Sequence, residues 1–446
     1  MGKCSREKEG PDPAEKCLEG LFLSEILIQG YRPLEGEIKI QGSKNSVLPM
    51  LAASILQQGI LKFTNVPIIQ DVLCMVGILE SVGCCCQWEG NSLTVDGAGV
   101  CCAEIPQEDV GKMRSSILLM GPLLGRCGRA VTWQPGGCSI GSRPVDLHLR
   151  AFSRLGAEVW EDREGKIEAS VNELQGNTIF FPFPSVGATE NALLAAVLAS
   201  GTTVIQGAAR EPEVISLCQM LRQMGADIFG EGSERIIIRG VKELSGTTVA
   251  VVGDRIAAGT YLAAAAAAGG HVRILEAPWE FMQREIQIFR QLGARVEPVY
   301  GDGGRTAGIE FWMERRPGAI SLSTSPYPGF PTDLQSPMLA VLSRAEGVSY
   351  LREKVFEARF KTAEELQKMG AQISVSGSQA EIRGCERLSG AVVKAWDLRG
   401  GAALAAAALA AKGETKIENC IHIERGYEDI CRDIHLLGGK MEWVRK

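Results

Sequence analysis

Along this chain, one pattern of apolar and polar positions recurs six times. In each copy a helix-like run ends with an apolar residue and a glycine, and an alternating, strand-like run follows. Glycine directly after a helix readily adopts the left-handed conformation that satisfies the last helical carbonyls. We therefore predict a helix end at each of Gly83, Gly156, Gly225, Gly293, Gly370 and Gly438.

A second glycine and a β-rich run precede these helix-like runs. Examples are residues 59–63, 201–205, 347–351 and 413–417, and the alternating runs that follow include residues 236–239 and 381–383. The predicted unit is a strand, a loop, a helix, a glycine and a strand pair. At about seventy residues the unit is too long for the common solenoid repeats. We expect two domains of three units each, in which sheets cover helices.

Composition and charge narrow the class of protein. The chain has 446 residues, 45% of them apolar, and a net charge of −6. It is long enough for two or more domains, and its charge does not indicate nucleic-acid binding. The alanine-rich stretches 262–268 and 402–411 are too short to span a bilayer and predict closely packed interior helices.

The cysteines and the N-terminus favour a cytoplasmic location. The fourteen cysteines have neither a regular disulfide spacing nor a Cys-x-x-Cys pair, so we expect free thiols in a reducing compartment and no metal site. Charged residues and prolines fill positions 3–16, where a secretory signal would be apolar. We expect residues 1–21 to form a flexible extension.

Residues 135–148 carry the most informative chemistry. Glycines and prolines surround Cys138, and Arg143 follows closely, so a loop that can bend carries both a thiol and a guanidinium group. An ordinary surface loop is the alternative interpretation. The equivalent loops of other repeats carry Arg210, Arg359 and Arg425. We expect these cations to face a cleft between the domains and to bind a multiply charged anion.

Motifs spread over all six repeats resemble those of enolpyruvyl transferases, and among them the UDP-N-acetylglucosamine 1-carboxyvinyltransferases. The motifs are residues 42–46, 113–116, 135–148, 185–189, 209–213, 330–333, 397–399 and 422–427. The resemblance implies an α+β fold, the two-domain α/β prism, with six β-α-β-α-β-β units and three units per domain. Residues 22–43 would join residues 254–446 in domain 1, and residues 44–253 would form domain 2 with the Cys138 loop.

The resemblance also implies a reaction. The enolpyruvyl group of phosphoenolpyruvate would pass to the 3′-hydroxyl of UDP-N-acetylglucosamine with release of phosphate, as the first committed step of peptidoglycan synthesis. Fosfomycin would target the enzyme, and no metal, other cofactor, membrane span or nucleic-acid partner is implied. Because phosphoenolpyruvate carries a phosphate and a carboxylate, several fixed cations must hold it. The matching positions are Lys44, Asn45, Arg143, Arg399 and Arg425.

The same resemblance implies roles in catalysis and acceptor binding. Cys138 matches the thiol that protonates C3 of phosphoenolpyruvate, and Asp333 matches the base beside the 3′-hydroxyl, although a Pro-Thr-Asp sequence is also a common helix cap. Asp397 would either move a proton in the second step or orient the neighbouring arginine. Lys44 and Arg425 complete the catalytic set. The matching nucleotide-sugar positions are Arg114, Arg143, Pro144, Val145, Asp146, Leu147, Ser185, Val186, Gly187, Asp333 and Val355.

Three sites depart from the family's usual residues. Ala358 stands where Asn or Ser is usual, Ala257 where some members carry Glu, and Gly400 and Gly401 where alanine is more common. None of these changes removes a group that the chemistry needs. They are compatible with a slower second copy of the enzyme.

Other functions fit the sequence less well. Residues 137–141 match the Gly-x-Ser-x-Gly nucleophile elbow of serine hydrolases, but Pro135-Gly136-Gly137 interrupts the strand that the elbow requires. A 5-enolpyruvylshikimate-3-phosphate synthase shares the fold and the reaction type but lacks the Cys138 loop. A regulatory paralogue that binds UDP-N-acetylglucosamine without turnover is the third alternative, which an assay of phosphate release would separate from the enzyme.

Overall fold

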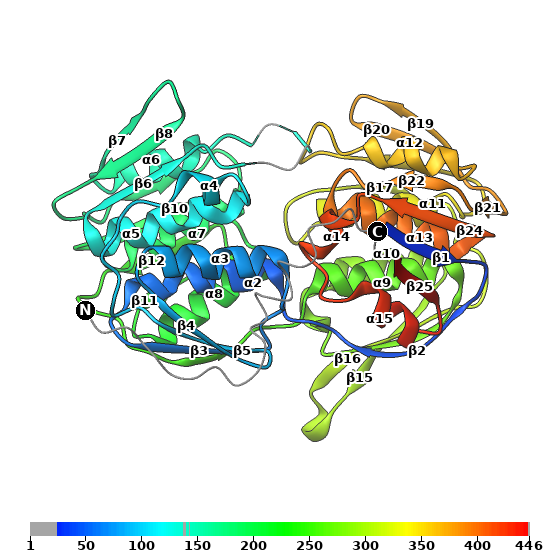
Figure 1. The fold of residues 1–446 in the computed structure, drawn as a ribbon, viewed down its shortest axis with the longest axis horizontal. Coiled ribbons are helices and arrows are strands. Elements are labelled where there is room, and N and C mark those ends of the chain that lie inside the picture. Colours follow the sequence, from blue (N-terminus) through cyan, green and yellow to red (C-terminus); the bar gives the residue numbers. More distant parts are fainter. Residues whose placement is uncertain (1–24, 137–139, 142, 445–446) are drawn as a thin grey trace.

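Two lobes lie side by side in the computed structural model, which describes residues 25–136, 140–141 and 143–444 (Figure 1). Each lobe has its own hydrophobic core. The continuous lobe has a core drawn from residues 47–251, whereas the discontinuous lobe combines residues 26–40 with residues 256–441. In Figure 1 the blue N-terminal strands accordingly lie in the same lobe as the red C-terminal elements. The predicted two-domain α+β organisation is confirmed.

The chain crosses between the lobes twice, and the two crossings run side by side. Gly42 and Gly253 form an antiparallel bridge, and the backbone N–H of Ser43 donates to the carbonyl of Val252 at 2.7 Å. We propose domain boundaries at these crossings because the two cores separate there. Residues 22–43 with 254–446 would form one domain and residues 44–253 the other. The predicted extension, residues 1–21, lies outside the described residues.

The described residues of the continuous lobe form three buried inner helices, three outer helices and three small sheets. Its inner helices are α2 (Lys44–Ala53), α5 (Met120–Cys127) and α7 (Val186–Ala196), and its outer helices are α3 (Gln70–Ser81), α6 (Asp146–Arg154) and α8 (Pro212–Gln223). Shorter helices are η1 (Ser54–Leu56), α4 (Gln107–Val110) and η2 (Arg114–Leu119). Its strands are β3 (Ile60–Thr64), β4 (Cys85–Glu89), β5 (Ser92–Asp96), β6 (Arg129–Trp133), β7 (Glu158–Glu161), β8 (Lys166–Ser170), β9 (Thr178–Phe180), β10 (Thr202–Gln206), β11 (Asp227–Phe229), β12 (Arg235–Arg239) and β13 (Thr248–Ala250).

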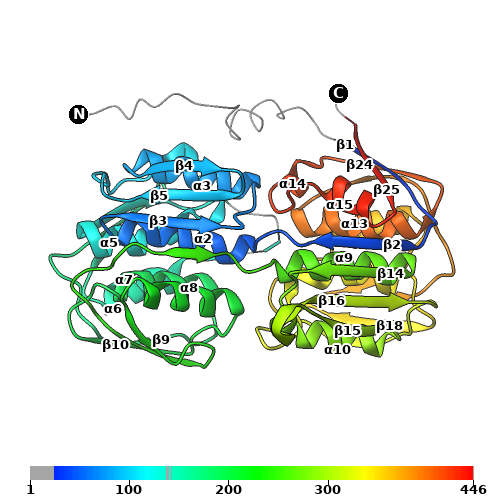
Figure 2. The same ribbon diagram turned by 90° about the horizontal axis from the view of Figure 1, so that it is seen from below.

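The discontinuous lobe repeats this plan (Figure 2). Its inner helices are α9 (Arg255–Ala268), α11 (Gln335–Leu342) and α13 (Leu398–Ala410), and its outer helices are α10 (Gln283–Gln291), α12 (Lys361–Lys368) and α15 (Ile430–Leu436). Shorter helices are η3 (Trp279–Phe281), η4 (Asp302–Gly304), η5 (Thr332–Leu334) and α14 (Ile421–Glu424). Its strands are β1 (Glu25–Gln29), β2 (Leu34–Lys39), β14 (Gly270–Leu275), β15 (Arg295–Tyr300), β16 (Thr306–Met313), β17 (Ser321–Ser323), β18 (Val348–Arg352), β19 (Gln372–Ser376), β20 (Gln379–Arg383), β21 (Leu388–Ser389), β22 (Val392–Lys394), β23 (Ala411–Lys412), β24 (Glu414–Glu418) and β25 (Lys440–Val444).

Each repeat folds into one outer helix and one sheet, as predicted. In one unit β18 pairs antiparallel with β20, which pairs antiparallel with β19, and α12 connects the first strand to this hairpin. Equivalent sheets form around β3, β6, β10 and β14. The last unit differs, because β1 from the other end of the chain lies between β24 and β25 and pairs antiparallel with both. The N-terminal strand therefore completes the C-terminal repeat.

All six repeat glycines end a helix in the predicted way. Gly83, Gly156, Gly225, Gly293, Gly370 and Gly438 have φ values between 79° and 111°, and each lies just beyond the last residue of an outer helix. Residues with a Cβ rarely adopt this left-handed conformation. The pattern that defined the repeat thus marks the turn from outer helix to strand.

The alanine-rich stretches form the centre of the discontinuous lobe. Nearly every residue of α9 and α13 is buried, and the small side chains let neighbouring helices approach closely. A Cβ added at Gly259 in α9 would lie 2.5 Å from Leu334 Cδ1. The prediction of interior helices is confirmed, except that Ala411 already begins β23. Within the described part of the chain, no helix is long and apolar enough to cross a membrane.

Candidate active site

Most of the predicted catalytic and phosphoenolpyruvate-binding residues lie at the N-terminal ends of inner helices. Lys44 is the first residue of α2, Asp333 lies in the short turn η5 directly before α11, and Arg399 is in the first turn of α13. Helix N-termini carry unpaired backbone N–H groups and the positive end of the helix dipole. Both features favour bound anions. The repeat therefore brings polar side chains to equivalent, anion-favouring positions in the two lobes.

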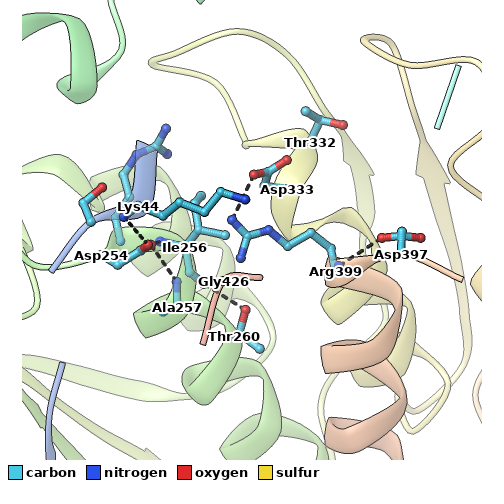
Figure 3. Close-up of polar contacts among 12 residues, drawn as sticks. Lys44, Asp254, Ile256, Ala257, Thr260, Thr332, Asp333, Asp397, Arg399 and Gly426 are labelled. Atoms are coloured by element: carbon cyan, nitrogen blue, oxygen red, sulfur yellow. Dashed lines mark hydrogen bonds and ion pairs between the residues drawn. The ribbon is translucent and has the colours of Figure 1, made fainter. Parts of the chain in front are cut away.

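Asp254 connects the starts of two inner helices from different lobes. Its Oδ1 accepts hydrogen bonds from the backbone N–H groups of Ile256 and Ala257 and so caps α9. Its Oδ2 accepts from the backbone N–H of Lys44, the first residue of α2, at 3.1 Å. Figure 3 shows this carboxylate between the two helix starts. At Ala257 the backbone N–H thus contributes to the helix cap.

One carboxylate, Asp71, holds two of the predicted phosphoenolpyruvate-binding cations. Its oxygens lie 2.6 Å from Lys44 Nζ and 2.9 Å from Arg425 Nε. Burial alone would raise the pKa of Asp71, but the two cations hold it below its usual value. Because Arg425 belongs to the discontinuous lobe and Asp71 to the continuous lobe, this ion pair joins the lobes. The sequence analysis did not single out Asp71.

A second carboxylate, Asp333, holds two arginines. Its Oδ1 lies 2.8 Å from Arg359 Nη2 and its Oδ2 lies 3.2 Å from Arg399 Nη2. Figure 3 shows the Lys44 side chain extending toward the same carboxylate. Burial would raise the pKa of Asp333, but Arg359, Arg399 and Lys44 together hold it well below its usual range. Asp333 is therefore a carboxylate at neutral pH, the protonation state that a base requires.

Asp397 acts on Arg399 through the backbone of α13. Its Oδ1 accepts from the N–H groups of Arg399 and Gly400, both at 2.9 Å, so it is the N-cap of the helix. A Cβ at Gly400 would lie 2.9 Å from Asp397 Oδ2, so glycine leaves room for this carboxylate. The guanidinium of Arg399 also reaches the Tyr427 hydroxyl at 3.4 Å. The sequence left two roles open for Asp397, proton transfer in the second step and orientation of Arg399. This geometry favours the orientation of Arg399.

The predicted nucleotide-sugar residues of the continuous lobe form a second group. Arg114 Nη2 donates to the carbonyl of Pro144 at 3.4 Å, and burial together with Arg143 lowers the pKa of Arg114 to about 10. The side chains of Val145 and Leu147 are buried in the core, so a ligand would meet their backbone. Asp146 is the first residue of α6.

A buried histidine connects this group to the start of α7. His148 Nδ1 lies 3.0 Å from Asn191 Nδ2, and a Cβ at Gly187 would lie 3.2 Å from His148 Cε1. Burial, with contributions from two nearby arginines, lowers the pKa of His148 to about 3, so the imidazole is neutral. Ser185 caps α7 by accepting from the N–H of Ala188, and Val186 begins the helix. Residues 143–148 and 185–187 are thus neighbours, as a shared ligand site requires.

Ile140 and Arg143, from the segment between β6 and α6, contact a loop of the other lobe. The carbonyl of Ile140 accepts from the backbone N–H of Ala358 at 3.1 Å, and the Arg143 guanidinium lies 5.5 Å from the centre of the Phe356 ring. Val355, another predicted nucleotide-sugar residue, is 39% exposed beside this contact. Cys138 lies outside the described residues.

Charged residues that the sequence analysis left unassigned form a buried contact between the lobes. Arg255, which begins α9, donates to both oxygens of Glu213 at 3.1 and 3.3 Å and to Glu285 at 3.4 Å. The backbone N–H of Tyr327 donates to Glu211 at 3.2 Å. Local sequence gave only one signal for this contact, the Glu-Pro-Glu at residues 211–213. Within the described ranges, no group of His, Cys, Asp and Glu side chains could hold a metal ion.

Comparison with known proteins identifies the family. The chain matches the model of EPSP synthase (3-phosphoshikimate 1-carboxyvinyltransferase) over residues 28–434. UDP-N-acetylglucosamine 1-carboxyvinyltransferase 2 of Caldanaerobacter subterraneus subsp. tengcongensis is 44% identical over 417 residues, which cover 93% of this chain and 98% of the relative. The UDP-N-acetylglucosamine 1-carboxyvinyltransferase of Paracoccus denitrificans is 43% identical over 431 residues, covering 95% and 99%.

Solved structures agree with this assignment. The enolpyruvyl transferase NikO from Streptomyces tendae matches 95% of this chain and 100% of its own, with a TM-score of 0.84 and 25% identity. EPSP synthase from Acinetobacter baumannii shares the fold, with a TM-score of 0.74 and 19% identity over the same shares of the chains. The chain belongs to the carboxyvinyltransferase family of EPSP synthase and, within it, to the UDP-N-acetylglucosamine 1-carboxyvinyltransferases. The predicted enolpyruvyl transferase fold is confirmed, and the protein is a transferase.

Proposed function

We propose that the protein transfers the enolpyruvyl group of phosphoenolpyruvate to the 3′-hydroxyl of UDP-N-acetylglucosamine and releases phosphate, as the first committed step of peptidoglycan synthesis. One observation carries the proposal for the site. Lys44, Arg399 and Arg425 come from both lobes and meet around two carboxylates, Asp71 and Asp333. Such a set of fixed cations suits a small substrate with a phosphate and a carboxylate.

Phosphoenolpyruvate would bind at the starts of α2 and α13. Lys44, Arg399 and Arg425 would exchange part of their contact with the two carboxylates for the substrate's anionic groups. Asn45, half-buried beside Lys44, would add a hydrogen bond, and Arg143 would approach from the 135–144 loop. The positive ends of the two helix dipoles would add to this positive surface.

UDP-N-acetylglucosamine would bind beside it, between the 143–148 segment, the start of α7 and the Val355 loop. Backbone N–H groups of residues 144–147 and 185–187 would contact the nucleotide and its diphosphate. Arg114 and Arg143 would neutralise the diphosphate charge. Asp333 would then lie near the sugar's 3′-hydroxyl.

The reaction would proceed by addition and elimination. Asp333 takes the proton of the 3′-hydroxyl while the oxygen of this hydroxyl bonds to C2 of phosphoenolpyruvate. At the same time the Cys138 thiol gives a proton to C3. In the second step the Cys138 thiolate left by the first step can take a proton back from C3, the double bond re-forms between C2 and C3, and the C2–O bond to phosphate breaks with its electron pair leaving on phosphate. Asp397 holds the start of α13, and thereby Arg399, toward the phosphate. When the phosphate recruits Arg399, one of the two ion pairs of Asp333 weakens and its pKa rises, which makes it a better base.

A phosphate-release assay with alternative acceptors tests the proposal. We expect release with phosphoenolpyruvate and UDP-N-acetylglucosamine, and none with shikimate 3-phosphate. Release only with shikimate 3-phosphate would indicate the EPSP synthase reaction. Binding of UDP-N-acetylglucosamine without release would indicate a regulatory paralogue. A cytoplasmic location is part of the proposal, and the cysteines of the described residues, which form no disulfide with one another, are compatible with it.

A further inference from the structure

Glu353 is a buried carboxylate that accepts four hydrogen bonds from residues of the described chain. It follows β18, and it is 2% exposed. Its Oε1 accepts from the Thr324 hydroxyl at 2.8 Å and from the backbone N–H groups of Val355 and Phe356 at 2.7 and 3.1 Å. Its Oε2 accepts from the Thr332 hydroxyl at 2.9 Å. Glu353 thus fixes the backbone of the Val355 loop on one side and a threonine next to Asp333 on the other.

Thr332 links Glu353 to Asp333 through Arg359. Its hydroxyl oxygen accepts from Arg359 Nη1 at 2.6 Å, so its single proton is free to point at Glu353. The other end of the same guanidinium, Nη2, donates to Asp333 Oδ1 at 2.8 Å. Arg359 is itself 4% exposed, and its guanidinium lies 5.3 Å from the centre of the Phe356 ring. A chain of contacts therefore runs from Glu353 through Thr332 and Arg359 to Asp333.

We propose that Glu353 is a positioning residue that sets both the Val355 loop and the orientation of Arg359 toward Asp333. The inference rests on the proposed function, in which the loop contacts the acceptor sugar and Asp333 takes its proton. One buried side chain would then support acceptor binding and proton transfer together. Its partners lie directly after β17, in the loop after β18 and in the turn that precedes α11, so it also fixes the distance between these segments.

The chemistry of the partners explains why this position needs a carboxylate. All four partners donate, and a glutamine offers one acceptor oxygen and one N–H₂ group. If its oxygen keeps the three donors on the Oε1 side, its N–H₂ faces the Thr332 oxygen, which already accepts from Arg359. The Thr332 hydroxyl oxygen can accept from both, but its own proton then loses the acceptor that Glu353 Oε2 provides. Burying a charge is costly unless hydrogen bonds satisfy it, so a site that serves packing alone would favour a neutral residue.

The charges around Asp333 predict in which direction a change at Glu353 would shift the pKa of Asp333. It faces Arg359 from the loop after β18, Arg399 from α13 and Lys44 from α2. Apart from the opposing effect of burial, Arg359 lowers the pKa of this carboxyl most. A loosened Arg359 would therefore raise the pKa of Asp333, and the pH at which acid protonates this carboxylate would move upward.

Kinetics and binding of Glu353→Gln, Thr332→Val and Thr332→Ser test the inference. For Glu353→Gln and Thr332→Val we expect kcat to fall between about tenfold and about a hundredfold, as for small misplacements of catalytic groups. The acidic limb of the kcat–pH profile should move to higher pH, and KM should rise for UDP-N-acetylglucosamine but not for phosphoenolpyruvate. Thr332→Ser keeps the hydroxyl and should restore wild-type values. Glu346→Gln, at an exposed glutamate just before β18, is the matched control.

The double variant, Glu353→Gln with Thr332→Val, tests whether Glu353 and Thr332 act on Asp333 through the same chain of contacts. We expect it to be no worse than the poorer single variant, because coupled residues are non-additive. An unchanged pH profile with equal loss for both substrates, or a Thr332→Val variant as active as wild type, would overturn the inference. Titration calorimetry with UDP-N-acetylglucosamine gives a readout without turnover. If the wild type releases no phosphate, the proposed function fails, and equal affinity of wild type and Glu353→Gln would then overturn the role of Glu353 separately.

Discussion

Asp71 and Arg425 lie 354 positions apart in the chain, yet Arg425 Nε donates to Asp71 Oδ1 at 2.9 Å. The contact joins the two lobes at the point where Lys44 also meets Asp71. The carboxylate therefore pairs with two cations that the proposed reaction needs for phosphoenolpyruvate and offsets part of their charge. Asp71 holds Lys44 and Arg425 in place before the substrate binds. Substitution of Asp71 therefore tests the anion site directly.

Asp71→Asn should make the protein less stable but more responsive to anions. Two cations would lose their shared counter-ion, and breaking a mostly buried pair costs about 3 kcal/mol or more. Inorganic phosphate should raise the Tm of Asp71→Asn more than that of wild type, because it can occupy the uncompensated site. Calorimetry with and without phosphate measures both effects. Asp302→Asn, at an exposed aspartate, should change neither, and an equal phosphate response in Asp71→Asn and wild type would contradict the prediction.

The stability contributed by Asp333 should depend on pH in a defined direction. The arginines and Lys44 hold its folded pKa below the ordinary aspartate value of 3.8 despite burial. A carboxyl with a lowered pKa stabilises the fold fully above its unfolded pKa, and this contribution is lost as the pH falls through the folded pKa. The Tm difference between wild type and Asp333→Asn should thus be constant from about pH 7 to pH 5 and shrink below about pH 4. A difference that grows in acid would show that the sign is wrong.

Arg399→Lys should impair turnover although the charge remains. Arg399 reaches Asp333 and the Tyr427 hydroxyl with two ends of one planar group, and the compact ammonium of lysine cannot make both contacts. We expect kcat to fall about a hundredfold, as for loss of one donor to a developing charge. Steady-state phosphate release measures this. Arg383→Lys, on the exposed end of β20, is the control, and equal activity of Arg399→Lys and wild type would exclude the bidentate role.

Fosfomycin should alkylate Cys138 in preference to the other thiols. The thiolate is the reactive form, and burial raises the pKa of Cys74 to about 11 and that of Cys84 to about 12. Mass spectrometry of digested protein should find the adduct on the peptide that contains Cys138. Cys138→Asp should keep part of the activity and resist the drug. An adduct on another cysteine, or a sensitive Cys138→Asp variant, would reject the assignment.

Local sequence was sufficient to predict the six-fold repeat and the ends of its helices. Each of the six glycines ends a helix because the conformation after a helix depends on the residue at that position. The alternating runs, such as residues 236–239 in β12, depend equally on nearest neighbours. The motifs also marked Lys44, Arg399 and Arg425, which the structure brings close together through Asp71 and Asp333.

Sequence reasoning could not find Asp71 or Glu353, because neither has a distinctive local pattern. An aspartate in the first turn of an outer helix usually indicates only a favourable helix dipole interaction, and a glutamate after a strand is usually solvated. Their importance depends on partners from distant segments, Arg425 for Asp71 and Thr332 for Glu353. The insertion of β1 between β24 and β25 is equally non-local.

The sequence by itself determined the six units, the helix ends, the interior helices and the residue types of an anion site, since all of these follow from short-range periodicity and motifs. Only the tertiary structure decided which carboxylate holds which cation and where the lobes touch. Ion pairing depends on distance and burial in space, and these are set when the two cores pack and the paired crossings bring the helix starts together.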